Sequence, residues 1–277
     1  MYKLIAIDLD GTLLNSKGEV STENRNAINL AKQKGIEVVL CSGRITSSVQ
    51  TLSKDIGADN YLISGNGAEL YDIKNKKILY ENYMSRETVL KLIKFCEGNS
   101  IYYSIFSENA IIAKTLNYNV LVYNSENATK PVDKKTNINI TQNIYEYIEN
   151  GRADKFSKIT ICDNNKTIFN GIINKLRTIK NIEVLDVAHM ANKTINTEKG
   201  EINVQYYYTE VTSKNVNKWN ALIKLAENLN INANEIACIG DNVNDKEMIQ
   251  NSGLRNSYGK QCAIYKRNWR LYSRNKQ

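Results

Sequence analysis

Two groups of carboxylates stand where they could hold a cation. Asp8 and Asp10 follow a short apolar run, and Asp241 and Asp245 follow another near the far end of the chain. Carboxylates that converge on one place repel each other unless a cation neutralises them. Oxygen ligands without nearby His or Cys favour Mg²⁺. An isolated D-x-D-G is also typical of a plain strand-end turn, so the second group is what favours a Mg²⁺ site.

The elements that must position these carboxylates alternate between strand and helix. The pattern predicts strands at 2–8, 36–41 and 61–64, a helix that starts at Ser21 or Thr22 and stops at Gly35, and another over 49–56. Such alternation indicates right-handed βαβ units and a parallel sheet. Ligands of these sheets bind beyond the carboxyl ends of the strands. Three groups follow strand ends and are expected at one edge: Asp8-Asp10, Ser42-Gly43-Arg44 and Asn66-Gly67.

The pattern changes in the middle of the chain. Helices are predicted near 85–97 and 165–180, with strand-like runs at 156–162 and 202–211. An amphipathic helix at 219–231 and a buried strand at 235–240 then resume the first pattern. We therefore predict an α/β core, residues 1–83 and 213–254, with a separate α+β module inserted at 84–212.

Composition bounds the class of protein. The chain has 277 residues and five scattered cysteines with no CxxC spacing, which favours reduced thiols in a cytoplasm. No run approaches the roughly 18 apolar residues of a membrane span, and we expect no membrane partner. The net charge of the whole chain is +8. Residues 255–277 contain seven Lys or Arg residues and no acidic residue, so residues 1–254 contain 30 basic and 29 acidic residues.

The basic tail offers an alternative to this picture. Aromatic residues stand among its cations, at Tyr258, Tyr265, Trp269 and Tyr272, a mixture that can bind nucleic acid. Because the charge belongs to the tail and not to the predicted core, we do not favour a nucleic-acid partner.

Four motifs in order resemble those of the haloacid dehalogenase (HAD) superfamily of phosphatases. They are D8-L-D10-G-T-L, S42-G-R, Lys218, and G240-D-N-V-N-D245. The insertion after the second motif, and N66-G-A-E, resemble the Cof-type subgroup, subclass IIB, with its large α/β cap. The resemblance covers residues 1 to about 254 and implies a Rossmann-like parallel-sheet core with an inserted cap.

The resemblance also implies roles for the carboxylates. Asp8 is similar to the nucleophile that forms an aspartyl-phosphate, and Asp10 to the general acid and base. The implied Mg²⁺ ligands are Asp8, the backbone carbonyl of Asp10, and Asp241. Asp245 is expected to orient waters or Lys218 from outside the ligand set.

Further site residues follow from the same motifs. Ser42 and the Gly43 amide are similar to the groups that hold a phosphate oxygen, and Lys218 to the lysine that stabilises the charge of nucleophile and phosphate. Asn244 is expected to bind phosphate or Asp8.

The roles of three other residues are less fixed by the motifs. Arg44 could contact substrate or pair with a carboxylate, and Asn66 is a further candidate substrate contact. His189, the only histidine, lies in the insertion and is expected to be a surface or structural residue.

The implied activity is hydrolysis of small phosphorylated metabolites, such as sugar phosphates or nucleotides. One alternative is a sugar phosphomutase, which would pass the phosphoryl group to an alcohol. The other is a weak or inactive protein, because bulky Trp219 follows the lysine where the family has a small residue, and because the C-terminus is altered.

Residues 255–269, R-N-S-Y-G-K-Q-C-A-I-Y-K-R-N-W, depart from the family pattern. The pattern continues with a strand and a loop similar to A-M-G-N-A, then a helix containing V-K. With a suitable choice of synonymous codons, the same string read one nucleotide later gives E-I-R-M-G-N-N-A-P-Y-I-K-E-I, which is similar to the missing segment. We therefore expect the tail at 255–277 to pack poorly and to lack the final strand and helix of the core.

We predict that a frameshift near codon 255 replaced the natural C-terminus. Sequencing the gene should reveal, in the frame one nucleotide later, an open stretch that encodes M-G-N and then I-K. A gene without that second open stretch would contradict the prediction.

Overall fold

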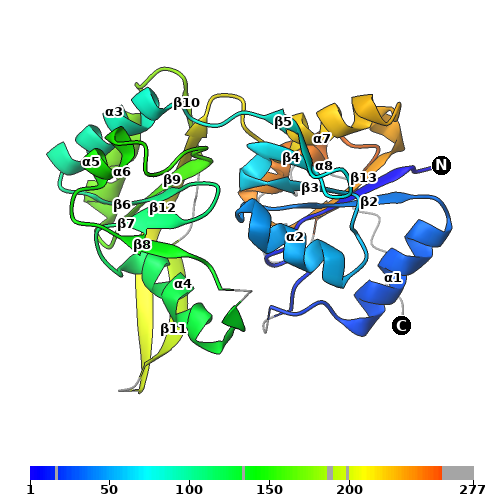
Figure 1. Ribbon diagram of the computed structural model, residues 1–277, viewed down its shortest axis with the longest axis horizontal. Helices are drawn as coiled ribbons and strands as arrows, with labels where there is room; N and C mark the ends of the chain where they lie inside the picture. Colours follow the sequence, from blue (N-terminus) through cyan, green and yellow to red (C-terminus); the bar gives the residue numbers. More distant parts are fainter. Residues whose placement is uncertain (16–17, 133–134, 186–189, 198–199, 258–277) are drawn as a thin grey trace.

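The computed structural model describes residues 1–15, 18–132, 135–185, 190–197 and 200–257. Its strands form two sheets that lie side by side, each with its own helices (Figure 1). Strands from 4–81 and 236–257 build the first sheet, and strands from 102–213 build the second. The predicted fold class, a Rossmann-like α/β core with an inserted α/β cap, is confirmed.

The core sheet has the strand order β14-β13-β1-β2-β3-β4-β5. Its parallel strands are β1 (Leu4–Ile7), β2 (Glu37–Cys41), β3 (Tyr61–Ser64), β13 (Ile236–Gly240) and β14 (Leu254–Ser257). An antiparallel hairpin, β4 (Glu69–Asp72) and β5 (Lys77–Glu81), extends one edge. Strand β1 pairs with β2 on one side and β13 on the other, so it joins the two halves of the core.

Alternating side chains bury both faces of this sheet. Leu4 and Ala6 pack under α7 (Lys218–Asn228) and α8 (Lys246–Asn251). Ile7 and neighbouring apolar residues pack on the opposite side with α1 (Thr22–Gln33) and α2 (Thr46–Asp55). A strand buried on both faces reads as a continuous apolar run, which is why the first strand was visible in the sequence.

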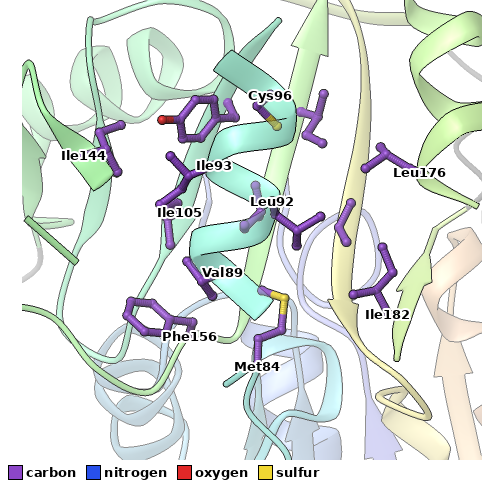
Figure 2. Close-up of a cluster of buried hydrophobic side chains, with 14 of the residues drawn as sticks. Met84, Val89, Leu92, Ile93, Cys96, Ile105, Ile144, Phe156, Leu176 and Ile182 are labelled. Atoms are coloured by element: carbon purple, nitrogen blue, oxygen red, sulfur yellow. The ribbon is translucent and has the colours of Figure 1, made fainter. Parts of the chain in front are cut away.

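The cap sheet has the order β10-β12-β9-β6-β7-β8, and β11 also pairs with β12. Its strands are β6 (Tyr102–Phe106), β7 (Ile111–Ala113), β8 (Ile138–Ile140), β9 (Lys158–Asp163), β10 (Ile182–Val184), β11 (Met190–Thr197) and β12 (Gly200–Ser213). Helices α3 (Arg86–Gly98), α5 (Ile144–Glu149) and α6 (Lys166–Leu176) bury one face. Figure 2 shows Val89, Leu92 and Ile93 of α3 among the apolar side chains of this layer.

A fourth cap helix, α4 (Tyr118–Thr129), packs on the other face of the sheet. Its Val120 joins Phe106 of β6 and Ile45 of the core in a small apolar cluster. This helix and α5 were not predicted, because α4 lacks a strong 3.6-residue period and α5, with six residues, is too short to show one.

Strand β14 pairs in parallel with β13 through residues 254–257. The chain therefore adds one more strand beyond the point where the sequence places the start of the altered tail. The rest of that tail, residues 258–277, lies outside the described residues. Within the described ranges, no helix is both long and apolar enough to cross a membrane.

Leu92→Ala should destabilise the cap, because Leu92 is buried in the layer of Figure 2. We expect a loss of about 2–5 kcal/mol in the free energy of unfolding. Urea unfolding measures it, with Leu116→Ala as the control because Leu116 is an exposed leucine of the same cap. Equal midpoints for the two variants would contradict the packing described.

Candidate active site

The predicted groups lie at neighbouring strand ends of the core sheet. Asp8 follows β1, Ser42 follows β2, Asn66 lies in a 3₁₀ turn after β3, and Asp241 follows β13. Because the order is β13-β1-β2-β3, these four strands are consecutive in the sheet. The first and last parts of the chain thus meet at one edge, where parallel sheets bind ligands.

A buried lysine holds the centre of this edge. The Nζ atom of Lys218 lies 2.5 Å from Oδ1 of Asp8 and 2.7 Å from Oδ1 of Asp245. The lysine is fully buried in the first turn of α7. Burial alone would lower its pKa, but the charges of Asp245 and Asp8 outweigh burial and raise it, so the side chain stays an ammonium ion.

Local backbone structure fixes the start of α7. The side chain of Asn217 caps the helix by accepting a hydrogen bond from the Asn220 N–H. Gly67 has a positive φ of 99°, and a Cβ there would lie only 2.2 Å from the Asn217 carbonyl oxygen. Glycine at 67 therefore lets the turn after β3 pack closely against Asn217, the residue before Lys218.

Three carboxylates gather around the ammonium. Single ligand atoms of Asp8, Asp241 and Asp245 all lie within 4.8 Å of one another. Burial raises the pKa of Asp8 to about 6. The charge of Lys218 opposes this rise, and the charge of Asp245 adds to it. Burial also raises the pKa of Asp241, against a 2.9 Å hydrogen bond from the Thr12 hydroxyl to its Oδ1. Acidic groups held this close fit a divalent cation.

The three carboxylates are not equivalent. Besides Lys218, Asp245 binds the backbone N–H groups of Asp241 and Asn242, both 3.0 Å from its Oδ2. Both of its oxygens are therefore engaged by the protein. Asp8 and Asp241 remain as the side chains suited to hold a cation, while Asp245 holds the lysine and the loop.

Asp10 points to a different partner. Arg44 donates two hydrogen bonds to its carboxylate, from Nε to Oδ2 at 2.9 Å and from Nη2 to Oδ1 at 2.5 Å. Desolvation would raise the pKa of Asp10, but the hydrogen bonds and charge of Arg44 outweigh it and lower the pKa. Of the two roles considered for Arg44, the structure therefore shows the pairing with a carboxylate.

The candidate phosphate-binding residues lie beside these groups. The buried hydroxyl of Ser42 accepts a hydrogen bond of 3.2 Å from the Arg44 N–H, which leaves its own proton to donate. Asn244 donates from Nδ2 to Oδ1 of Asn66 at 3.0 Å. A Cβ at Gly43 would lie 2.6 Å from that Asn66 oxygen, so glycine is needed for this approach.

Some functional contacts were not foreseen from the sequence. Thr12 binds Asp241, although its place directly after D-x-D-G could have suggested a role. Glu210 of the cap accepts a hydrogen bond from Asn66 and another from Lys158, and no motif marks either cap residue. Trp219 is half-buried and packs against the apolar cluster beneath the sheet, which gives its ring a structural place. His189 lies outside the described residues.

Comparison with known proteins agrees with this geometry. A family model described as haloacid dehalogenase-like hydrolase matches residues 5–257. Phosphatase YwpJ of Bacillus subtilis is 30% identical over 257 residues, 91% of this chain and 87% of that protein. The 5-amino-6-(5-phospho-D-ribitylamino)uracil phosphatase YwtE of Bacillus subtilis is 26% identical over 262 residues, with 91% and 86% covered.

A solved structure of a haloacid dehalogenase-like hydrolase from Bacteroides thetaiotaomicron has the same fold. Its TM-score is 0.75 at 25% identity, covering 96% of this chain and 92% of that one.

Lys218→Met should leave the carboxylates of Asp8 and Asp245 buried without their shared cation. Removing one partner of a buried ion pair costs about 3–5 kcal/mol, so we expect a loss of that size in the free energy of unfolding. Unfolding by urea in the presence of EDTA measures it. The control is Lys224→Met, since Lys224 makes an exposed pair with Glu227 on the same helix. A Lys218→Met protein as stable as the control would contradict the assigned burial and pairing.

Proposed function

The chain belongs to the haloacid dehalogenase-like hydrolase family and is a phosphoric monoester hydrolase, and we propose that it hydrolyses small phosphorylated metabolites with Mg²⁺ through an aspartyl-phosphate on Asp8. The observation that carries this proposal is the buried contact of Lys218 with Asp8, beside Asp241 from the other end of the chain. A nucleophilic carboxylate needs such positive charge, because a phosphate dianion would otherwise repel it.

The donor set fits Mg²⁺. Asp8 and Asp241 offer carboxylate oxygens, and the backbone carbonyl of Asp10 would complete the protein ligands, with waters and phosphate oxygens filling the rest. Among the described residues, Oδ1 of Asn244 is buried without a hydrogen-bond partner, and this acceptor suits a water molecule held in the site. When bound, Mg²⁺ would neutralise charge between the carboxylate and the phosphoryl group.

The residues then divide the reaction into two steps. An oxygen of Asp8 attacks phosphorus, the bond from phosphorus to the ester oxygen breaks, and Asp10 gives a proton to the departing alkoxide. Asp10 then takes a proton from water, which attacks phosphorus and releases inorganic phosphate and free Asp8. Ser42, the Gly43 amide and Asn244 would hold phosphate oxygens, and Lys218 stabilises the developing charge.

Arg44 bears on the first of these steps. Its pairing holds the Asp10 carboxyl group ionised, which suits the base role and opposes the acid role. The acid role therefore requires Arg44 to turn away from Asp10 when an ester binds.

The substrate class is proposed as sugar phosphates or nucleotides. A relative such as YwtE, whose name gives a phosphorylated ribitylamino-uracil as substrate, supports a small polar ester. The cap would close over the ester, exclude water and select the leaving group. The scattered buried thiols of Cys41, Cys96, Cys162 and Cys238 support a cytoplasmic location.

Asp8→Asn should abolish turnover, because an amide oxygen cannot form the aspartyl-phosphate. We expect a loss of about a thousandfold or more in kcat, as for other removed nucleophiles. An aryl phosphate assay measures it with Mg²⁺, with EDTA, and with Mg²⁺ restored, and we expect activity only where Mg²⁺ is present. The matched control is Asp59→Asn, since Asp59 is an exposed aspartate paired with Lys32.

Equal turnover by Asp8→Asn and the unchanged protein would overturn the proposed mechanism. Time-resolved release of inorganic phosphate separates hydrolysis from transfer to a second sugar hydroxyl, which would release none.

A further inference from the structure

A chain of polar contacts runs from the interior of the cap to the carboxylate site. Glu210 of β12 accepts a hydrogen bond from Lys158 of β9 and another, of 2.5 Å, from Nδ2 of Asn66. Asn66 lies in the core and accepts the bond from Asn244 at 3.0 Å. Asn244 immediately precedes Asp245, which holds Lys218. Three successive contacts thus connect the cap with the loop that fixes the lysine.

The cap end of this series of polar contacts is rigidly held. Glu210 pairs with Thr160 in the β9–β12 ladder, so Lys158, two residues before Thr160, shares the same face of the sheet. Lys158 is 4% exposed, and its Nζ lies 4.6 Å from the centre of the Phe106 ring. Lys158 therefore fixes the Glu210 carboxylate in one place.

The core end depends on the cap. Asn66 is buried with a left-handed backbone (φ 61°, ψ 24°), and both ends of its amide are used, one for Glu210 and one for Asn244. Within the described part of the chain, the amide oxygen of Asn244 has no partner, so its contact with Asn66 is the side-chain hydrogen bond that orients it. If the cap moved away, Asn66 would lose the acceptor that fixes its amide.

We propose that Glu210 is a positioning residue for hydrolysis: from the cap it fixes the amide of Asn66, and Asn66 in turn orients Asn244 in the site. This inference rests on the proposed function, because it assigns Asn244 a place beside the phosphoryl group. It makes the phosphate-binding arrangement complete only when the cap is closed, which restricts turnover to enclosed substrate.

The test replaces both members of the cap pair, Glu210 and Lys158, in one variant. Glu210→Leu with Lys158→Met leaves no unpaired buried charge, and such replacements are often neutral for stability, while Asn66 loses its acceptor. The matched control is Glu97→Leu with Lys114→Met, which removes a more exposed pair in the same cap. We expect kcat for the first double variant to fall on the order of tenfold to a hundredfold, with the control unchanged and both unfolding midpoints near that of the unchanged protein.

Two further measurements separate positioning from other roles. The fold-loss should be the same for aryl, sugar and nucleoside phosphates, since Asn244 acts on the shared phosphoryl group. On an Asn244→Ala background, the same double substitution should cause no further loss, because the residue that it positions is already gone. Should the cap pair variant fail to fold, Asn66→Gly removes the amide that joins Glu210 to Asn244, suits the left-handed backbone and leaves Glu210 paired with Lys158, and it should show the same losses.

The outcomes are distinct. A double variant with unchanged kcat overturns the inference and leaves the proposed function standing. A loss that differs among the three esters also overturns it, since Glu210 would then be contacting the leaving group. An unchanged protein that hydrolyses none of the esters with Mg²⁺ removes the proposed function and, with it, this inference.

Discussion

The whole candidate site depends on one buried ammonium group shared by two carboxylates. Lys218 is fully buried and pairs with Asp8, which follows β1, and with Asp245, which ends the 3₁₀ turn after β13. Neither carboxylate could be buried without it, since an unpaired charge in this environment is costly. Two glycines allow this packing around the lysine. A Cβ at Gly67 would clash with the backbone of Asn217, which precedes Lys218, and a Cβ at Gly240 would clash with the side chain of Asp245.

A second constraint is that one residue of the candidate site is hydrogen-bonded from the cap. The amide of Asn66 is shared between Asn244 in the core and Glu210 in the cap. The carboxylates of the candidate site follow strands of the core sheet, whereas the amide of Asn66 beside them is also bonded from the cap. Hydrogen bonds therefore join the candidate site to the cap, beside the small apolar cluster in which Ile45 of the core contacts Phe106 and Val120.

Much of this arrangement could be predicted from the sequence, for a physical reason. Short apolar runs in the sequence mark the core strands, because these strands are buried on both faces. The site residues come just after such strands: Asp8, Ser42, Asn66 and Asp241. Glu210 and Lys158 could not be found, because their partners are brought near by the packing of two domains. Helix α4 was missed because Y-N-V-L-V-Y-N-S-E-N mixes strand-favouring residues with asparagine, and tertiary contacts decide its state.

The pairing of β1 with two partners has a consequence for how the protein is made. Leu4 lies opposite Glu37 on one side and Ile236 on the other. As the polypeptide leaves the ribosome, β1 and β2 can join early, but the other edge of β1 must wait for a segment more than 200 residues later. The cap, whose sheet uses strands from 102–213, can fold in the meantime. For most of its synthesis the nascent chain therefore carries an uncovered strand edge, which is the kind of surface that chaperones shield from aggregation.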